Sequence, residues 1–83
     1  MTQPEKKIRA GAISATIWNN EAVNPKGELN FYSTISIERS YKDKEGKWQY
    51  TNSMRLSDLP KAALVLNKAY EYLIFKEKEA AME

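Results

Sequence analysis

A hairpin-like stretch of the chain carries aromatic and basic side chains of the kind that bind nucleic acid. Tyr41 precedes a loop at residues 43–46, and Trp48 and Tyr50 follow it. Arg39 lies on the same stretch. Aromatic rings stack on nucleobases, and cationic side chains neutralise phosphates. The pattern therefore predicts binding of single-stranded nucleic acid by stacking and charge neutralisation.

Other side chains could extend this predicted site. The candidate nucleic-acid-binding residues are Lys7, Arg9, Trp18, Arg39, Tyr41, Lys44, Lys47, Trp48, Tyr50 and Arg55. Structural roles are the alternatives: the rings would form a cross-strand cluster that stabilises the hairpin, and the lysines would flank a solvated turn. Trp18 could equally belong to the core or to a subunit contact.

The residue types argue against catalysis. The 83 residues include neither cysteine nor histidine, so the chain has no thiol nucleophile, imidazole base or soft metal ligand. Carboxylates can coordinate magnesium, but no pair of them occupies an apolar segment that would perturb their pKa. We expect a protein that is not an enzyme and has no cofactor, bound metal or small-molecule substrate. A carboxylate-dependent metal enzyme is the least favoured alternative.

Positive charge is concentrated in the first part of the chain. The formal net charge is +2, with nine basic and six acidic residues in 1–57, against four and five in 58–83. The excess is small for a protein that binds a polyanion. Most of the basic residues therefore lie in the part of the chain that is predicted to form strands.

Hydrophobic periodicity predicts an α+β fold, with an antiparallel sheet of three to four strands followed by one long C-terminal helix. Residues 7–18 alternate as β structure, and a change of parity beside Gly11 indicates one kinked strand or two short ones. Residues 19–30 contain turn-forming pairs and are predicted as an exposed connection. One domain at 7–80 is expected between flexible ends at 1–6 and 81–83.

The predicted register places the large apolar side chains of the next two strands on one face. A four-residue loop at 43–46 would pair Tyr41 with Trp48 and Arg39 with Tyr50. The following helix begins at a cap formed by Ser57 or Asp58. The pairs at the far end of this hairpin would then project beyond the helix.

The helix carries more apolar residues than one sheet can cover. The stripe predicted to pack on the sheet is Leu59, Ala62, Ala63, Leu66, Ala69, Tyr70 and Leu73. A second set, predicted to form a dimer interface, is Leu64, Val65, Tyr72 and Phe75. A chain of this size buries only about 60% of its unfolded surface, and it lacks disulfides and zinc ligands, so we expect a homodimer.

Residues 35–48, Ile-Ser-Ile-Glu-Arg-Ser-Tyr-Lys-Asp-Lys-Glu-Gly-Lys-Trp, followed by Leu56-Ser57 and a helix, resemble the transcriptional coactivator positive cofactor four family. The resemblance covers about 31–75. It implies a dimer with central helices and curved sheets that bind single-stranded DNA with weak sequence preference. It aligns Tyr41 with the family's strand-end aromatic residue and places basic positions near Lys44 and Lys47.

The chain departs from this family at residues 51–53, Thr-Asn-Ser, where the family carries a basic segment. Similar strand-rich, helix-terminated units occur in the Pur-alpha and Whirly single-strand binders. We therefore expect a coactivator-like binder of single-stranded DNA, with RNA as the alternative ligand. A small dimeric protein-protein interaction module is the alternative function.

The expected compartment follows from the absence of apolar segments long enough for a membrane helix or the core of a signal peptide. We expect a cytoplasmic protein without a membrane partner, associated with the nucleoid in a prokaryote or located in the nucleus of a eukaryote.

Overall fold

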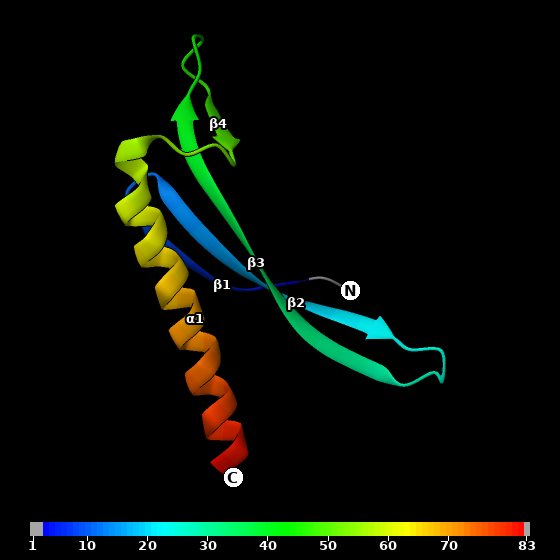
Figure 1. Ribbon diagram of the computed structural model, residues 1–83. Coiled ribbons are helices and arrows are strands. Elements are labelled where there is room, and N and C mark those ends of the chain that lie inside the picture. The colour runs from blue at the N-terminus through cyan, green and yellow to red at the C-terminus, as the bar shows by residue number, and fades with distance from the viewer. Residues whose placement is uncertain (1–2, 83) are drawn as a thin grey trace.

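The fold is a four-stranded antiparallel sheet with one long helix packed across part of one face (Figure 1). The computed structural model describes residues 3–82, and the side chains of 4–76. The elements are β1 (Gln3–Ala10), β2 (Ile13–Val23), β3 (Leu29–Lys42), β4 (Trp48–Thr51) and α1 (Leu59–Met82). The strands are hydrogen-bonded in the order β1-β2-β3-β4. The α+β class and the C-terminal helix predicted from the sequence are confirmed.

The change of parity near Gly11 marks a tight hairpin. Ala10 pairs with Ile13, which leaves Gly11 and Ala12 as a two-residue turn. Gly11 has φ +61°, and a type II′ turn requires a positive φ at this first central position. The alternative of two short strands is therefore correct. β1 begins at Gln3, four residues before the predicted strand, and the predicted flexible ends lie partly outside the described residues.

The two longer hairpins share one loop design. Asn24 and Asp43 each accept two backbone N–H bonds from the loop that follows, at 2.9–3.0 Å. Each loop spans three residues and ends at a glycine, Gly27 (φ +83°) or Gly46 (φ +81°). This is the geometry of a turn closed by a left-handed residue. The prediction of an exposed connection over 19–30 is wrong, because β2 and β3 continue to this short loop.

The same loop corrects the predicted register of the last hairpin. The backbone N–H of Asp43 donates to the Lys47 carbonyl at 2.9 Å, so the loop has three residues instead of four. Tyr41 consequently faces Gln49, and Trp48 faces Lys42. A shift of one residue moves every side chain of one strand to the opposite face relative to its partner.

The predicted Tyr41/Trp48 and Arg39/Tyr50 pairs are therefore wrong. Arg39 lies opposite Thr51, and Tyr50 lies opposite Ser40. Arg39 and Tyr41 lie on the face of the sheet that carries the helix, while Trp48 and Tyr50 lie on the other face. The aromatic cluster expected on one face is divided between both.

The core lies between β2 and α1. Its buried apolar residues are Ile13, Ala15, Ile17, Ala62, Val65 and Ala69. Val65 is 1% exposed, and Tyr72 lies 5.2 Å below the Lys6 ammonium of β1. The prediction that these two residues point away from the sheet is wrong. Leu66 and Tyr70, predicted to pack on the sheet, are exposed instead.

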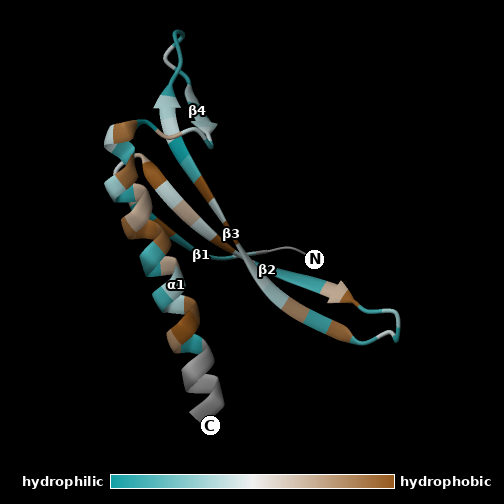
Figure 2. Ribbon diagram, in the orientation of Figure 1, coloured by the Kyte–Doolittle hydropathy of each residue, from teal (hydrophilic) through white to brown (hydrophobic). Residues whose placement is uncertain are grey.

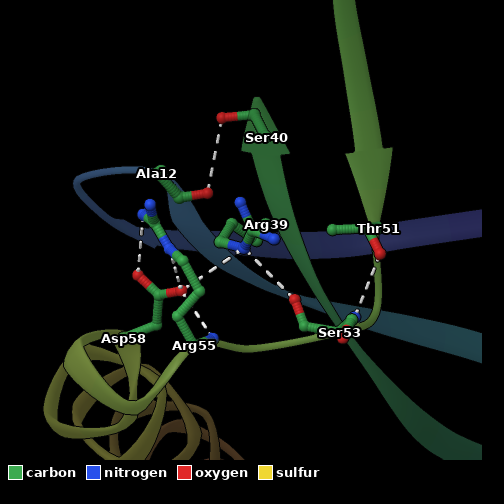
Figure 3. Close-up of polar contacts among 7 residues, drawn as sticks. All are labelled: Ala12, Arg39, Ser40, Thr51, Ser53, Arg55 and Asp58. Carbon is green, nitrogen blue, oxygen red and sulfur yellow. Dashed lines mark hydrogen bonds and ion pairs between the residues drawn. The ribbon is translucent and has the colours of Figure 1, made fainter. Parts of the chain in front are cut away.

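A buried carboxylate sets the rotation of the helix. Asp58, in a single 3-10 turn at Leu56–Asp58, is 6% exposed and accepts a 2.9 Å bond from the backbone N–H of Arg55. Its Oδ2 also lies 3.3 Å from Nε of Arg39 on β3 and 3.2 Å from Nε of Arg55 (Figure 3). With Asp58 held against β3, the positions that follow at four- and three-residue spacing, beginning with Ala62 and Val65, face the sheet.

The molecule is thin and extended. Its dimensions are 50 × 28 × 16 Å, and its radius of gyration is 15.9 Å, whereas a compact domain of this length has about 12 Å. The distal part of β2 and β3, residues 19–33, forms a ribbon that diverges from α1 (Figure 1). Hydrophobic residues continue along this ribbon toward its tip (Figure 2). No helix among the described residues is long and apolar enough to cross a membrane.

Candidate nucleic-acid interface

The face of the sheet opposite α1, called the helix-free face below, collects rings and cations from all four strands. Strand registers place there the cations Lys7, Arg9 and Lys42, and the rings of Trp18, Tyr32, Trp48 and Tyr50. Glu38 also lies on this face. The described part of the face therefore carries three cations and one carboxylate at its strand positions. Such a surface attracts polyanions.

The rings on this face differ in how firmly they are held. Trp18 is half-buried, and its Nε1 donates to Ser36 Oγ at 2.8 Å, so the indole is held against the sheet. Trp48 and Tyr50 are 62% and 58% exposed. The Lys42 ammonium lies 5.2 Å from the Trp48 ring centroid. A cation is thus positioned beside an accessible ring, where a phosphate and its base would need them.

Short polar side chains form the floor between the rings. These residues are Ser14, Thr16, Thr34, Ser36 and Ser40. Asn20 is 8% exposed, and its Nδ2 donates to Thr34 Oγ1 at 2.9 Å. Because the floor residues are small, Trp48, Tyr50 and the long cations project above them. The face is a wide surface for an extended ligand.

One end of the helix-free face is hollowed into a cavity of about 470 Å³. This hairpin pocket is lined by Arg9, Gly11, Ala12, Ser40, Trp48 and Tyr50. The backbone N–H of Ser40 donates to the Ala12 carbonyl at 2.9 Å, and its hydroxyl donates to the same oxygen at 3.4 Å (Figure 3). These bonds join the first turn of the chain to β3 and close the floor of the pocket.

Five of the ten predicted binding residues share this face: Lys7, Arg9, Trp18, Trp48 and Tyr50. Arg39 lies on the helix side, where its Nε donates to the Ser53 carbonyl at 3.1 Å and its guanidinium carbon is 5.6 Å from the Tyr41 ring centroid. Arg55 is also engaged there by Asp58. The structure thus separates Arg39, Tyr41 and Arg55 from the exposed rings.

The last two predicted cations occupy the β3–β4 loop. Lys44 is exposed, and the Lys47 ammonium lies 3.7 Å from Glu45. Asp43 accepts bonds from the Lys47 and Glu45 backbone N–H groups and from Gln49, and the bond from Lys47 is the main cause that lowers its pKa. The loop therefore keeps a carboxylate ionised beside its lysines, which weakens it as an anion site.

The sequence analysis did not identify Tyr32 or the turn at residues 11–12 as parts of the site, and it did not place Lys42 beside Trp48. The missing signal was the loop pattern: Asn24-x-x-Gly27 and Asp43-x-x-Gly46 have the same acceptor and glycine spacing. Reading both as three-residue loops would have extended β2 and β3 and shifted the last register by one residue. That shift places Lys42 beside Trp48.

A second cavity, of about 710 Å³, lies between the β2–β3 ribbon and the distal half of α1. Phe31 lines one side, and Tyr70, Leu73 and Ile74 line the other. A 2.8 Å ion pair joins Glu5 of β1 to Lys76 of α1 beside it. The lining of this ribbon–helix groove is more apolar than polar. It adjoins exposed residues of the helix stripe at four- and three-residue spacing, namely Leu59, Ala63, Leu66 and Tyr70, and the half-buried Leu73.

The predicted dimer residues are likewise divided. Leu64 and Phe75 are 50% and 58% exposed and lie on a different side of α1 from the exposed stripe. Val65 and Tyr72 contact the sheet side, as described above. Among the described residues, no group of three acidic side chains could together hold a metal ion.

Searches of protein-family models, curated proteins and solved structures find no match to this chain.

Proposed function

We propose that this protein binds single-stranded DNA, with RNA as the alternative ligand, on the helix-free face of its sheet. The observation that carries this proposal is the register of β3 and β4, which brings Lys42, Trp48 and Tyr50 to the same face as Arg9 and Trp18. Stacking on exposed rings contributes about 1–3 kcal/mol per base. The cations beside the rings would neutralise the phosphates that link the stacked bases.

The exposed rings favour a single strand over a duplex. Stacking on Trp48 or Tyr50 requires a base face that is free, and in a duplex these faces are covered by neighbouring base pairs. Several of the small polar residues on this face, such as Ser36, Thr34 and Ser40, already form hydrogen bonds within the protein. Weak overall sequence preference is the expected consequence.

The proposal includes a homodimer, supported by the area the chain exposes. Its accessible surface is 6519 Å² at a mass of 9.6 kDa, whereas a compact monomer of that mass exposes about 5,100 Å². The excess is larger than the roughly 800 Å² that each partner contributes to a typical stable interface. A second copy of the chain is therefore a sufficient partner for the exposed apolar surface.

The exposed apolar residues are arranged so that two copies could cover each other. The ribbon presents Phe31, Leu29 and Val23, which are more than half exposed, and α1 presents the exposed stripe beside the same groove. In a two-fold dimer each chain contributes both surfaces, so the ribbon of one could pack on the helix of the other. The helix-free faces would remain open to the ligand.

The sequence resemblance supports the same class of function. The order of four strands and a helix agrees with the architecture that the positive cofactor four resemblance implies. Its basic segment is replaced here by Thr51-Asn52-Ser53. In the proposed mode Lys7, Arg9 and Lys42 would supply the cations.

Fluorescence anisotropy tests the proposal. We expect labelled oligo-dT to bind at low salt, a duplex of the same length to bind more weakly, and log affinity to fall with log salt by about 0.7 for each phosphate neutralised. Failure to bind oligo-dT and single-stranded RNA at low salt would contradict the proposal. A nuclease-insensitive pull-down of a protein partner would then favour the interaction-module alternative.

A further inference from the structure

The hairpin pocket has the size and chemistry of a site for one nucleobase. Its volume of about 470 Å³ lies within the range of small-molecule pockets, about 300–1,000 Å³. Trp48 and Tyr50 come from the same face of β4 and supply two accessible rings. Arg9 comes from β1, on the other side of the turn at residues 11–12. An aromatic surface and a cation thus meet around one hollow.

The guanidinium of Arg9 is available for a ligand. Within the described part of the chain, its side chain has no hydrogen-bond or ion-pair partner. This distinguishes it from Arg39 and Arg55, whose guanidinium groups are engaged by Asp58. A guanidinium presents several N–H donors in one plane and no acceptor, so its natural partner is a pair of acceptors on one edge.

Among the purines, guanine alone offers such an edge to an arginine. Its O6 and N7 are both acceptors, whereas adenine places the N6 amino donor beside N7. Cytosine, whose O2 and N3 are adjacent acceptors in an unpaired strand, has a smaller ring surface for stacking on Trp48 or Tyr50. Ser40, which lines the same hollow, uses its hydroxyl proton on the Ala12 carbonyl and so retains the lone pairs of Oγ as acceptors. The pocket therefore complements a base with adjacent acceptors and a further donor.

We propose that the hairpin pocket is a guanine-selective subsite, in which the base stacks on Trp48 or Tyr50 and directs O6 and N7 to the Arg9 guanidinium. The inference rests on the proposed single-strand binding and adds a preference at one position of an otherwise sequence-tolerant surface. The charge of Arg9 would attract the phosphates of any strand, whereas its two parallel N–H donors would match the two acceptors of guanine. A lysine at position 9 keeps the charge and loses the fork.

Anisotropy with short oligo-dT, compared with the same oligomer carrying one central dG, dA or 7-deaza-dG, tests this subsite. A short oligomer limits the number of binding registers, and a single dG avoids guanine quadruplexes. We expect dG to tighten binding at least about fivefold, and dA and 7-deaza-dG, which has no N7, to give little or no gain. Arg9→Lys should lower the ratio of dG affinity to oligo-dT affinity to about one, and this ratio is measured within each protein, whatever its affinity for oligo-dT.

The control variant is Lys26→Arg, at the exposed tip of the β2–β3 ribbon, which should preserve the dG preference. Equal affinity for all four oligomers would overturn the subsite while leaving single-strand binding intact. A dG preference that survives in Arg9→Lys would also overturn it, since the guanine would be read elsewhere. Absence of binding to every oligomer would contradict the proposed function and the subsite together.

Discussion

The side chains available for the proposed ligand are those that have no hydrogen-bond or ion-pair partner of their own within the part of the chain that the structure describes. The chain has several arginines and aromatic residues, and the structure sorts them by partner. Arg39 and Arg55 neutralise Asp58, and Trp18 is hydrogen-bonded to Ser36. Arg9 and Trp48, by contrast, point to solvent on the helix-free face, where a ligand can reach them.

Substitution of one ring on each face of the β3–β4 hairpin tests this division. Trp48→Ala should weaken binding of oligo-dT about tenfold, because it removes one stacking surface. Tyr41→Ala should change the affinity less than twofold, because Tyr41 lies on the helix side beside Arg39. Anisotropy titrations of both variants measure the difference. The family resemblance assigns the stacking role to Tyr41, and the opposite result would support that assignment.

Asp58 is a carboxylate whose charged form contacts two arginines, Arg39 and Arg55, in the folded protein. Hydrogen bonds from the Arg55 side chain and backbone are the main causes that lower its pKa below the ordinary value of 3.8, and the charge of Arg39 adds to them. A carboxyl group with a lowered pKa in the folded state stabilises that state above its unfolded pKa. The contribution disappears as the pH falls through the folded pKa.

Asp58→Asn should therefore lower the urea midpoint at neutral pH and show a smaller loss of stability below about pH 4 than the wild type. Asp58→Asn should still lose some stability in acid, because the pKa values of Glu5 and Asp43 are also lowered in the folded state. Urea denaturation across this pH range measures the effect. Glu45→Gln is the control, because Glu45 is exposed in a loop. Parallel pH profiles for wild type and Asp58→Asn would contradict the role of Asp58.

The two hairpin loops are the elements that determine how the strands face each other. Each uses an Asn or Asp side chain to bind the loop backbone and a glycine with a positive φ to end it. The loop at 43–47 places Trp48 and Tyr50 on the helix-free face. Its glycine is therefore a structural requirement of the proposed site.

Gly46→Ala should destabilise the protein by about 1 kcal/mol through the left-handed backbone conformation. Nothing lies within 4 Å of the position that a Cβ would take, so a steric clash would not contribute. Gly46→Asn should cost less, because asparagine tolerates this conformation better than alanine. Urea denaturation measures both variants. Equal stability of Gly46→Ala and the wild type would contradict the loop geometry.

The orientation of α1 about its own axis determines which of its apolar residues are buried against the sheet and which are exposed. Ala62, Val65 and Ala69 face the sheet, and Leu66 and Tyr70, only one position further along, face solvent. The exposed stripe follows the same four- and three-residue spacing as the buried one. The Asp58 contacts favour one of the two stripes, because they hold the 3-10 turn that precedes α1 against β3.

At the scale of the whole molecule, the thin and extended shape leaves many apolar side chains of an isolated chain exposed to solvent. Only two layers are present within 16 Å, and the ribbon and the distal helix diverge instead of packing together (Figure 1). A second copy covering the ribbon–helix groove would complete the core. The interface of the proposed dimer and the helix-free face would then lie on opposite sides of the sheet.

Two leucines test where the proposed dimer forms. Leu66→Glu should convert the dimer to a monomer, because it places a charge on the stripe that adjoins the groove. Leu64→Glu should leave the dimer intact, although Leu64 is equally accessible on α1. Sedimentation equilibrium measures the mass, and circular dichroism shows whether each variant is folded. If Leu64→Glu alone produced a monomer, the dimer interface predicted from the sequence would be supported instead. A monomeric wild type would contradict the dimer.

The sequence by itself determined the elements and their approximate positions. Alternation along β2 and β3, turn-forming residues and the apolar spacing of α1 are local patterns, because each depends on residues close in the chain. They were sufficient to predict an antiparallel sheet, one terminal helix and five of the seven basic and aromatic residues on the helix-free face. The candidate chemistry of rings and cations was also readable at this level.

Only the tertiary structure decided which of those residues share a surface. A loop of three residues instead of four reverses the faces of β4 relative to β3, and the sequence pattern of Trp48 and Tyr50 is compatible with either face. The helix likewise carries two stripes of the same spacing, and the choice between them depends on Asp58 meeting Arg39 from a distant strand. Contacts between residues far apart in sequence supply the energy difference, so local pattern could not reveal it.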